Sequence, residues 1–326
     1  MTDDNTLSRR EALLKLLRVG GMGAAAAGLG LWLNRRSRHP EAALAAEVKH
    51  NFAVAADPNL PEMAVAQGDD PGALARAALE QLGGVRRFIA RNDVVVVKPN
   101  IAWDRTAEQA GNTNPELVAE VVRLCLEAGA ARVVVTDVSC NEPRRCFERS
   151  GIGTAARSAG AQVLLPEPRL FREIDLRGDV LRSWPVLQPF LEADKLINLP
   201  IAKHHSLTGC TLGMKNWYGI LGGQRSRLHQ RIHESLADLA DFMRPTLTIL
   251  DCYRVLLRNG PTGGNVEDVA LKRTVLAGTD PVALDAWAAK AYWDIDAQHL
   301  PYLKMAAGRG LGRVDFENVR TSVASL

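Results

Sequence analysis

The chain is poor in aromatic residues and has no concentrated basic segment after its first 45 residues. Phe, Trp and Tyr together make up 5% of the 326 residues. Residues 1–45 contain seven Lys/Arg and four Asp/Glu, so the rest of the chain carries 33 charges of each sign. Nucleic-acid binding needs a clustered surplus of Lys and Arg against the phosphates. The composition therefore excludes a nucleic acid as a partner of the main body of the protein.

Cysteines are also few: the sequence has five, and no two of them form a C-x-x-C pair. This absence excludes a zinc ribbon, a thioredoxin-type pair and a ferredoxin cluster motif. Cys125 falls at an apolar position of a predicted helix, where a core role is expected. Two interpretations stay open for the others. In the first interpretation, Cys140 and Cys146 form a disulfide in an oxidising compartment. In the second, an iron–sulfur cluster or a transition metal is held by Cys140, Cys146 and Cys210, with Cys252 or a histidine as the fourth ligand.

The N-terminus has the features of an export signal. Residues 8–15, SRREALLK, contain two adjacent arginines and lead into a glycine-rich apolar segment at 16–33. Such a pattern resembles a twin-arginine signal, and ALAAE at 43–47 offers an A-x-A cleavage pattern. Residues 1–45 are therefore expected to direct the protein through the twin-arginine translocase to the periplasm. Because the apolar segment is about long enough to span a bilayer, retention at the inner membrane by an uncleaved signal is the alternative.

After a lead-in at residues 46–62, strand and helix patterns alternate to the end of the chain. DVVVVKPNI (93–101) and ARVVVTDV (131–138) are continuous β-branched runs, typical of strands buried on both faces. Helices are predicted at 69–84, 113–130, 144–159, 230–242 and from Pro281 onward. This alternation predicts one α/β domain over 63–326, with a parallel or mixed sheet covered by helices on both faces. A small inserted lobe is expected around 201–230.

Polar residues follow several predicted strands. In open α/β sheets, ligands bind outside the carboxyl ends of the strands, so these residues indicate a site at one edge. The expected set is Lys98 and Asn100; Asp137, Ser139 and Cys140; Lys203, His204 and His205; Asp251 and Cys252; and Thr279 and Asp280. Asp280 directly precedes Pro281 and is also well placed as a helix cap. For Asp251 the alternative role is to cap a turn.

Residues 199–223, LPIAKHHSLTGCTLGMKNWYGILGG, concentrate candidate site residues in one glycine-rich segment. Its five glycines allow the backbone to approach a ligand closely. Lys98, Lys203 and Lys215, with Asn100 and Asn216, are predicted to hold an anionic ligand or cofactor. No G-x-x-x-x-G-K-[ST] or G-x-G-x-x-G follows a predicted strand, so no standard phosphate-binding loop is indicated.

Histidines supply the candidate proton-transfer groups. His204 or His205 is expected to move protons, because the ordinary pKa of histidine is about 6.5. His229 and His233 are four residues apart on the next predicted helix and share one face. That pair could bind a metal, although HQRIH lacks the glutamate of the zinc-protease motif.

Seven segments, in this order, resemble the "domain of unknown function 362" family over about residues 63–312. They are ALEQLGGVRRFIARNDVVVVKPNI, NPELVAEVVRLCLEAGA, VVVTD, LINLPIAKHH, GMKNWYGILGG, LTILDCYRVLLRNGPTGG and VLAGTDPVALDAWAA. The resemblance implies an α/β protein. Members often accompany ferredoxin-type iron–sulfur segments, which implies a redox role, but this chain lacks such a segment. The resemblance places Lys98, Asn100, Lys203, His204, Lys215 and Asn216 at motif positions.

These observations predict an exported protein that binds a cofactor or metal. The leading expectation is a redox enzyme that acts on a small anionic molecule and exchanges electrons with a redox partner, with Asp137 and Asp251 as candidate catalytic carboxylates. One alternative is a non-catalytic periplasmic protein for anion binding or maturation. A second alternative is a metal-dependent hydrolase or isomerase that uses His204, His229, His233 and Asp251.

Overall fold

The structure is a computed structural model, and it describes residues 51–326. The predicted signal at 1–45 and the first part of the lead-in lie outside the described residues. The described residues belong to one compact unit. Within this part of the chain, no helix combines the length and the apolar character needed to cross a membrane.

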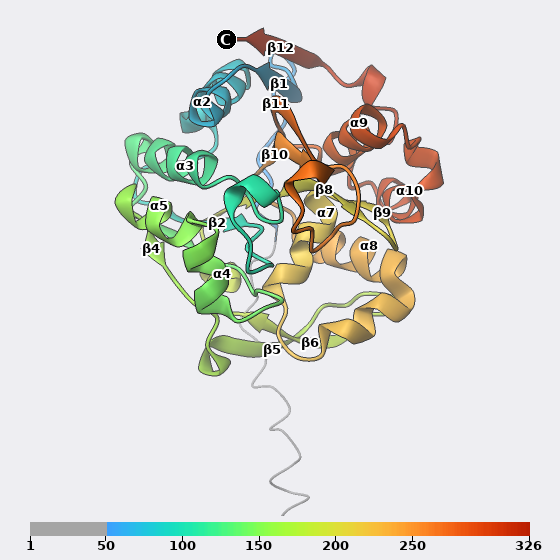
Figure 1. Ribbon diagram of the computed structural model, residues 1–326. Coiled ribbons are helices and arrows are strands. Elements are labelled where there is room, and N and C mark those ends of the chain that lie inside the picture. Colours follow the sequence, from blue (N-terminus) through green and yellow to red (C-terminus); the bar gives the residue numbers. More distant parts are fainter. Residues whose placement is uncertain (1–50) are drawn as a thin grey trace, which may run out of the picture. The chain divides into compact units, whose positions relative to one another are not determined.

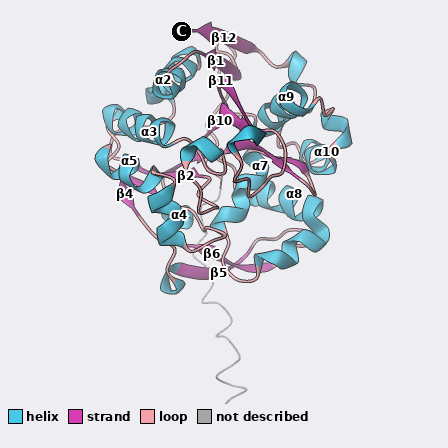
Figure 2. Cartoon of the chain, viewed as in Figure 1, coloured by secondary structure: helices cyan, strands magenta, loops and turns pink. Residues whose placement is uncertain are grey.

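Strands and helices alternate along most of the chain (Figures 1 and 2). The strands are β1 (Met63–Gln67), β2 (Val94–Pro99), β3 (Arg132–Val135), β4 (Gln162–Val163), β5 (Phe171–Asp175), β6 (Ser183–Leu187), β7 (Lys195–Leu199), β8 (Ile201–His205), β9 (Gly209–Thr211), β10 (Leu247–Leu256), β11 (Val269–Gly278) and β12 (Thr321–Ser325). The helices are α2 (Pro71–Gln81), α3 (Pro115–Ala128), α4 (Pro143–Arg149), α5 (Ile152–Ser158), α6 (Pro189–Glu192), α7 (Gly213–Asn216), α8 (Ile232–Phe242), α9 (Pro281–Trp293) and α10 (Pro301–Gly308).

Ten of the described strands form one mixed sheet, which confirms the predicted α/β class. Eight follow the order β12-β1-β11-β10-β7-β2-β3-β4, and the β8–β9 hairpin joins through β8 to β10. Strands β10, β7, β2, β3 and β4 pair in parallel, and β8 is parallel to β10. Helices cover the sheet on two sides: α2, α3 and α5 lie on one side, and α7 to α10 lie on the other (Figure 1).

Local sequence signals explain where α3 begins and ends. The Asn114 side chain accepts a hydrogen bond from the Glu116 N–H at 3.0 Å, and Pro115 occupies the first helical position. Gly129, with φ 103°, ends the helix in the left-handed conformation. Leu117, Val121 and other apolar residues of α3 are buried in the core between this helix and the sheet. The Thr113 N–H donates to the Asn100 carbonyl at 2.9 Å, which fixes the start of α3 close to the carboxyl end of β2.

Two predictions about segments were wrong. The helix predicted at 144–159 is divided into α4 and α5, because Gly151 adopts φ 76° between them. The inserted lobe expected at 201–230 is not separate, since β8 and β9 extend the main sheet. A smaller two-stranded sheet instead forms from β5 and β6.

The predicted convergence of strand ends was correct for some strands and wrong for others. Strand β11 runs antiparallel to β10, so Thr279 and Asp280 lie at the opposite edge of the sheet. There Asp280 caps α9, accepting the Ala283 N–H at 2.9 Å. Asp251 and Cys252 lie inside β10 rather than after it. The residues that follow β2 and β3 and those on the β8–β9 hairpin do meet, and they form the site described below.

Candidate functional site

A pocket of about 490 Å³ opens where β2, β3 and the β8–β9 hairpin meet the segment 215–229. Its volume is in the range typical of small-molecule sites. Its polar and aromatic lining is Lys98, Asn100, Trp103, Asp137, Cys140, Lys203, His205, Thr211, Lys215, Asn216, Tyr218, Gln224, Arg225, Ser226 and His229. The segment that the sequence singled out therefore forms one wall, and the ends of two parallel strands form the other.

The β8–β9 hairpin decides which of two adjacent histidines reaches the pocket. Successive side chains of a strand point to opposite faces, so Lys203 and His205 share one face of β8. Thr211 pairs with Lys203 across the hairpin and also lines the pocket. His204 is not part of the lining, and its Nδ1 accepts the Gly260 N–H at 3.2 Å. Of the two candidate histidines, the structure brings only His205 to the site.

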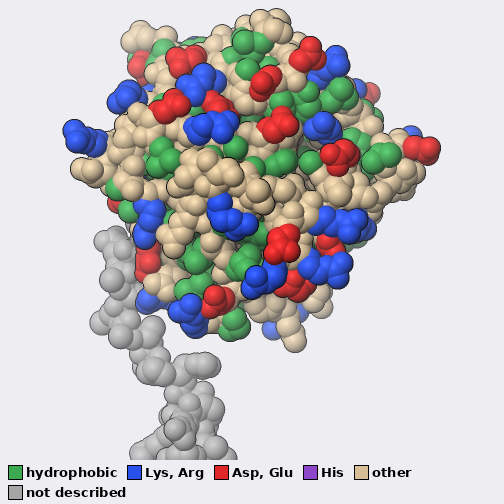
Figure 3. Space-filling model, turned by 60° about the vertical axis from the view of Figure 1, so that its left-hand side comes forward, with side chains coloured by type: hydrophobic (Ala, Val, Ile, Leu, Met, Phe, Trp, Pro, Cys, Tyr) green, Lys and Arg blue, Asp and Glu red, His purple; other side chains and the backbone are tan. Residues whose placement is uncertain are grey.

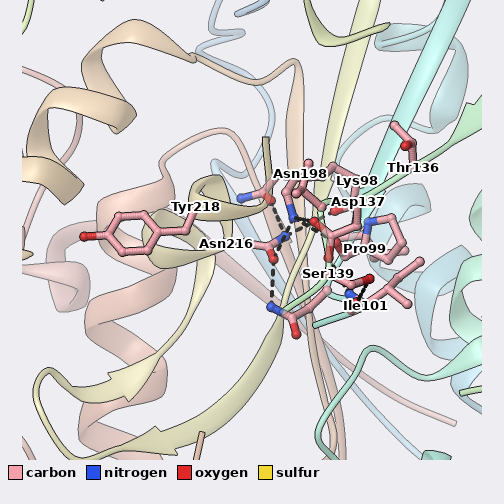
Figure 4. A network of polar contacts seen from close by, with 12 residues as sticks. Lys98, Pro99, Ile101, Thr136, Asp137, Ser139, Asn198, Asn216 and Tyr218 are labelled. Atoms are coloured by element: carbon pink, nitrogen blue, oxygen red, sulfur yellow. Dashed lines mark hydrogen bonds and ion pairs between the residues drawn. The ribbon is translucent and has the colours of Figure 1, made fainter. Parts of the chain in front are cut away.

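A buried polar network anchors the base of the pocket (Figure 4). Lys98 is fully buried, and its Nζ lies 2.7 Å from Asp137 Oδ1. It also donates to Asn216 Oδ1 at 3.0 Å. Asn216 accepts a second bond from Asn100 and donates through its Nδ2 to Asn198 at 2.8 Å. Burial lowers the pKa of Lys98, and the Asp137 carboxylate only partly offsets this effect.

Two glycines of the segment are required by close packing against carboxylates. A Cβ on Gly219 would lie 1.9 Å from Asp137 Oδ1 and 2.6 Å from Lys98 Nζ. A Cβ on Gly213 would lie 2.9 Å from Asp285 Oδ1. The Gly213 N–H donates to that carboxylate at 2.7 Å. These glycines therefore let the segment close over buried polar groups, whereas the sequence suggested that they approach a ligand.

Lys203 is buried and hydrogen-bonded, but no carboxylate lies within ion-pair distance of it in the described part of the chain. Its Nζ donates to Asn100 Oδ1 at 2.9 Å and to the Gly111 carbonyl at 2.6 Å. Burial lowers the pKa of Lys203 to about 7, and the charges of Lys215 and Lys98 act in the same direction. An amine with this pKa is close to half protonated at neutral pH.

Lys215 has neither a hydrogen bond nor an ion pair within the described residues. Its Nζ lies 4.4 Å from the centroid of the Tyr218 ring, a cation–π contact. The residue is 8% exposed and lines the pocket. Burial lowers the pKa of Lys215 to about 8, and the nearby Arg225 contributes in the same direction. The ammonium group is thus a buried cation whose donors are free for a ligand.

Arg225 adds a fourth cationic group at the pocket. Its guanidinium donates to the carbonyls of Val138 at 2.7 Å, Tyr218 at 3.2 Å and Ser139 at 2.6 Å. These bonds fix its position, but no carboxylate among the described residues neutralises its charge. Asp137 is the single Asp or Glu in the lining, again within the described part of the chain. The pocket therefore carries a surplus of positive charge.

The pocket histidines are held neutral. Nδ1 of His205 accepts the Leu207 N–H at 3.1 Å, so the neutral ring carries its proton on Nε2. Burial, together with Lys215 and other nearby cations, lowers the pKa of His205 to about 3. His229 stacks on His205 with ring centroids 6.4 Å apart, and its pKa is also lowered, chiefly by burial. Near neutral pH the titrating amines are therefore Lys203 and Lys215, and His205 serves as a hydrogen-bond donor.

A family model described as "Domain of unknown function (DUF362)" matches residues 95–290, more than half of the chain. The chain belongs to the DUF362 family. The match begins inside β2 and ends in α9, so it includes every residue of the polar network and of the β8–β9 hairpin.

Two further proteins resemble this DUF362 chain. A thylakoid-associated protein of Synechocystis sp. is 28% identical over 225 residues, which cover 64% of this chain and 66% of that protein. The chain thus spans just under two thirds of that relative's length. The lactate racemase apoprotein from Thermoanaerobacterium thermosaccharolyticum superposes with a TM-score of 0.44 at 12% identity. That superposition covers 71% of this chain and 58% of the other, and we draw nothing from it about function.

The four cysteines predicted as metal ligands do not gather in this DUF362 protein. Cys140 is exposed at the pocket, whereas Cys146, Cys210 and Cys252 are buried. Cys146 lies 3.8 Å from the Ala102 carbonyl, and Cys210 lies 3.8 Å from the Tyr302 hydroxyl. All five thiols are free, so the structure has no Cys140–Cys146 disulfide.

The other candidate metal ligands also lie apart from one another. His229 lines the pocket, while His233 stacks on Tyr302 with ring centroids 6.1 Å apart. Within residues 51–326, no three His, Cys, Asp or Glu side chains come together as a metal site. The residues present therefore do not fit a preformed iron–sulfur or transition-metal centre, and that cofactor stays a prediction.

Asp251, a predicted catalytic carboxylate, has structural partners. It is buried inside β10, where its carboxylate accepts the N–H groups of Asn114 at 2.7 Å and Tyr253 at 3.0 Å. Burial raises the pKa of Asp251 to about 6, and these two hydrogen bonds oppose the rise. Asp251 thus fixes the start of α3 and is not part of the pocket lining.

Sequence reasoning missed four polar residues of the pocket, namely Thr211, Gln224, Arg225 and Ser226. Arg225 stands just past the glycine-rich segment, and an Arg two residues after a Gly-Gly pair was the available signal. Thr211 reaches the pocket only through the β8–β9 register, which pairs it with Lys203. Its hydroxyl has no hydrogen-bond partner among the described residues. Arg225 and Thr211 offer donors to a ligand.

Proposed function

We propose that this DUF362 protein binds a small anionic molecule, bearing a carboxylate or phosphate group, in the lysine-lined pocket. The observation that carries the proposal is the charge of the lining. Lys98, Lys203, Lys215 and Arg225 face one pocket, and Asp137 is paired with Lys98 alone. A buried cation without an acceptor is unfavourable, so an anion that reaches Lys215 is stabilised on binding.

Hydrogen-bond donors beyond the lysines support the same proposal. Nε2–H of His205 and the hydroxyl of Thr211 both lie on the hairpin face that carries Lys203. An oxyanion accepts such bonds, whereas a cationic ligand would find one carboxylate, already paired. Trp103 and Tyr218 add apolar surface for the remainder of the ligand.

A catalytic function at the same site is the second candidate. An acid or base works best when its pKa lies near the operating pH, and the pKa of Lys203 is about 7. Lys203 is therefore suited to move a proton on a bound acid, as an isomerase or hydrolase requires. The binding proposal does not depend on the redox role expected from the sequence.

We also propose that the protein acts outside the cytoplasm. The adjacent Arg9 and Arg10 support export by the twin-arginine route. The name of the Synechocystis relative, thylakoid-associated, is compatible with a membrane-associated or extracytoplasmic location. Periplasmic release and retention at the inner membrane are both consistent with these observations.

Titration calorimetry on the full-length protein tests the binding proposal. Sulfate, phosphate and citrate are titrated in turn, with glycerol as an uncharged control. We expect at least one anion to bind with a stoichiometry of about one, and to bind more weakly as ionic strength rises. No binding of any anion, or equal binding of glycerol, would contradict the proposal.

A further inference from the structure

Cys140 is the one exposed thiol at the pocket. All five cysteines of the sequence lie within residues 51–326, and the other four are buried. Cys140 follows β3 at the carboxyl edge of the sheet, and its N–H donates to the Ala102 carbonyl at 2.8 Å. Its backbone is therefore fixed, while its side chain stays accessible from the pocket.

Cationic side chains surround this thiol. Arg225 Nη2 lies 3.9 Å from Cys140 Sγ, and Lys203 and Lys215 line the same pocket. Nearby cations stabilise a thiolate, and the thiolate is the nucleophilic form of cysteine. The Arg225 guanidinium is held by three backbone carbonyls, so it stays beside the sulfur.

A second, independent observation indicates that a ligand reaches this thiol. Lys215 is more than nine-tenths buried and lines the pocket with Cys140, yet its ammonium has no hydrogen bond or ion pair in the described part of the chain. An anion bound by Lys215 would lie in the cavity that Cys140 also lines. The pocket therefore combines an anion-binding group with a nucleophile.

We propose that Cys140 is a nucleophile that adds to the carbonyl carbon of a small oxo acid held by Lys215. The thiolate sulfur forms a bond to the carbonyl carbon, and the π electrons of the carbonyl move to its oxygen. That oxygen takes a proton from a lysine ammonium, which leaves a neutral amine and a hemithioacetal that keeps the carboxylate charge of the oxo acid. The step is an addition, so it needs no oxidant or reductant. This inference rests on the proposed anion-binding function.

Charge-selective alkylation tests the nucleophile. The full-length protein is treated with iodoacetate and, separately, with iodoacetamide under the same conditions, and peptide mass mapping locates the label. Free cysteine serves as the reference thiol. We expect the iodoacetate-to-iodoacetamide rate ratio at Cys140 to exceed that of free cysteine by on the order of tenfold, because the pocket attracts the anionic reagent. The variant Lys215→Gln should lower this ratio, and Cys140→Ser should take up no label.

The addition of Cys140 to a carbonyl carbon is tested by a separate measurement, ¹³C magnetic resonance. With glyoxylate labelled by ¹³C at its aldehyde carbon, the wild-type protein should give a bound resonance of an sp³ carbon attached to sulfur. The Cys140→Ser variant should not give it. Charge-selective alkylation without this resonance would overturn the oxo-acid assignment.

The failure of this inference can be told apart from the failure of the proposed function. If wild-type protein binds sulfate or citrate but its Cys140 has the rate ratio of free cysteine, the nucleophile is overturned and anion binding stands. If no anion binds, the proposed function fails. Labelling at a different cysteine would also overturn the inference.

Discussion

At the scale of single residues, the site contains two kinds of cation. Lys98 is neutralised by Asp137 and fixed by Asn216, so it belongs to the framework of the pocket. Lys215 and Arg225 lack a carboxylate partner in the described part of the chain, so their charge is available to a ligand. The distinction separates residues whose loss should affect stability from residues whose loss should affect binding.

Removing the charge of Asp137 should destabilise the protein. In the variant Asp137→Asn, the fully buried Lys98 loses its ion-pair partner. Breaking a buried pair by removing one member costs about 3–5 kcal/mol. Urea unfolding of this variant should show a loss in that range, and Lys215→Gln should show a much smaller one. Equal stabilities of Asp137→Asn and wild type would contradict a structural role for the pair.

Anion affinity should fall as the pH rises. The pKa of Lys203 is lowered to about 7 and that of Lys215 to about 8, and a bound anion favours the protonated form of both. The two ammonium groups are present below these values, so affinity is greatest below about pH 7 and declines as the pH rises through about 8.

Sulfate is a suitable anion for measuring affinity as a function of pH, since the charge of sulfate is constant over this pH range. Calorimetry in buffers of different ionisation enthalpy should also show that sulfate binding takes up protons at pH values near the pKa values of Lys203 and Lys215. His205, whose pKa is lowered to about 3, should not contribute. Affinity that rises with pH would be inconsistent with lysines as the binding groups.

At the scale of elements, the segment that contains α7 closes over the polar network because two of its glycines have no side chain. The variant Gly219→Ala would place a methyl group on Asp137 and Lys98. Overpacking of this kind costs about 1–3 kcal/mol. We expect a lower midpoint in urea and weaker anion binding.

Gly308 at the end of α10 provides the matched control, since a Cβ there would meet no atom within 4 Å. The variant Gly308→Ala should be neutral or slightly stabilising, because alanine favours a helix. Similar losses for Gly219→Ala and Gly308→Ala would mean that close packing at residue 219 is unimportant.

The sequence predicted the positions of strands and helices better than the pairing and direction of the strands. Runs of β-branched residues located β2 and β3, and Pro115 and Asn114 located the start of α3, because these signals are local. Strand direction depends on which strand becomes the neighbour, so the antiparallel β11 and the position of Asp280 were not foreseen. The choice between His204 and His205 likewise needed the β8–β9 register.

The positions of the cysteines relative to one another also could not be predicted from local sequence signals. Four of them follow or interrupt predicted strands, which suggested convergence on a metal. Three of them are instead buried. Sequence spacing fixes the element that a cysteine occupies, but burial and direction depend on tertiary packing. The lysines do meet in one pocket: Lys98 lies near the carboxyl end of β2, and Lys203 lies in the middle of β8.

At the scale of the whole molecule, charge is balanced overall and concentrated locally. The chain after residue 45 carries equal numbers of each sign, and Figure 3 shows Lys/Arg and Asp/Glu side chains mixed over one face. The cationic surplus of the pocket is therefore a local feature. It suits a small anion, whereas a nucleic acid would require an extended basic surface.

Export should depend on the two adjacent arginines near the N-terminus. In the variant with both Arg9→Lys and Arg10→Lys, the charge is kept but the twin-arginine pattern is lost. We expect cell fractionation to find this protein in the cytoplasm. A matched variant with Arg35→Lys and Arg36→Lys should be exported like wild type. Unchanged export of the first variant would rule out the twin-arginine route.

The most direct test of the account compares two lysine variants in one binding experiment. Lys215→Gln removes the unpaired ammonium of the pocket, and Lys304→Gln removes an exposed ammonium of α10 that is not part of the lining. Because a charged hydrogen bond contributes about 1.5–3 kcal/mol, Lys215→Gln should weaken the binding of an anion by about tenfold or more. Calorimetry on the full-length proteins should show this loss for Lys215→Gln and wild-type affinity for Lys304→Gln. Equal affinities for the two variants would contradict the assignment of the pocket as an anion site.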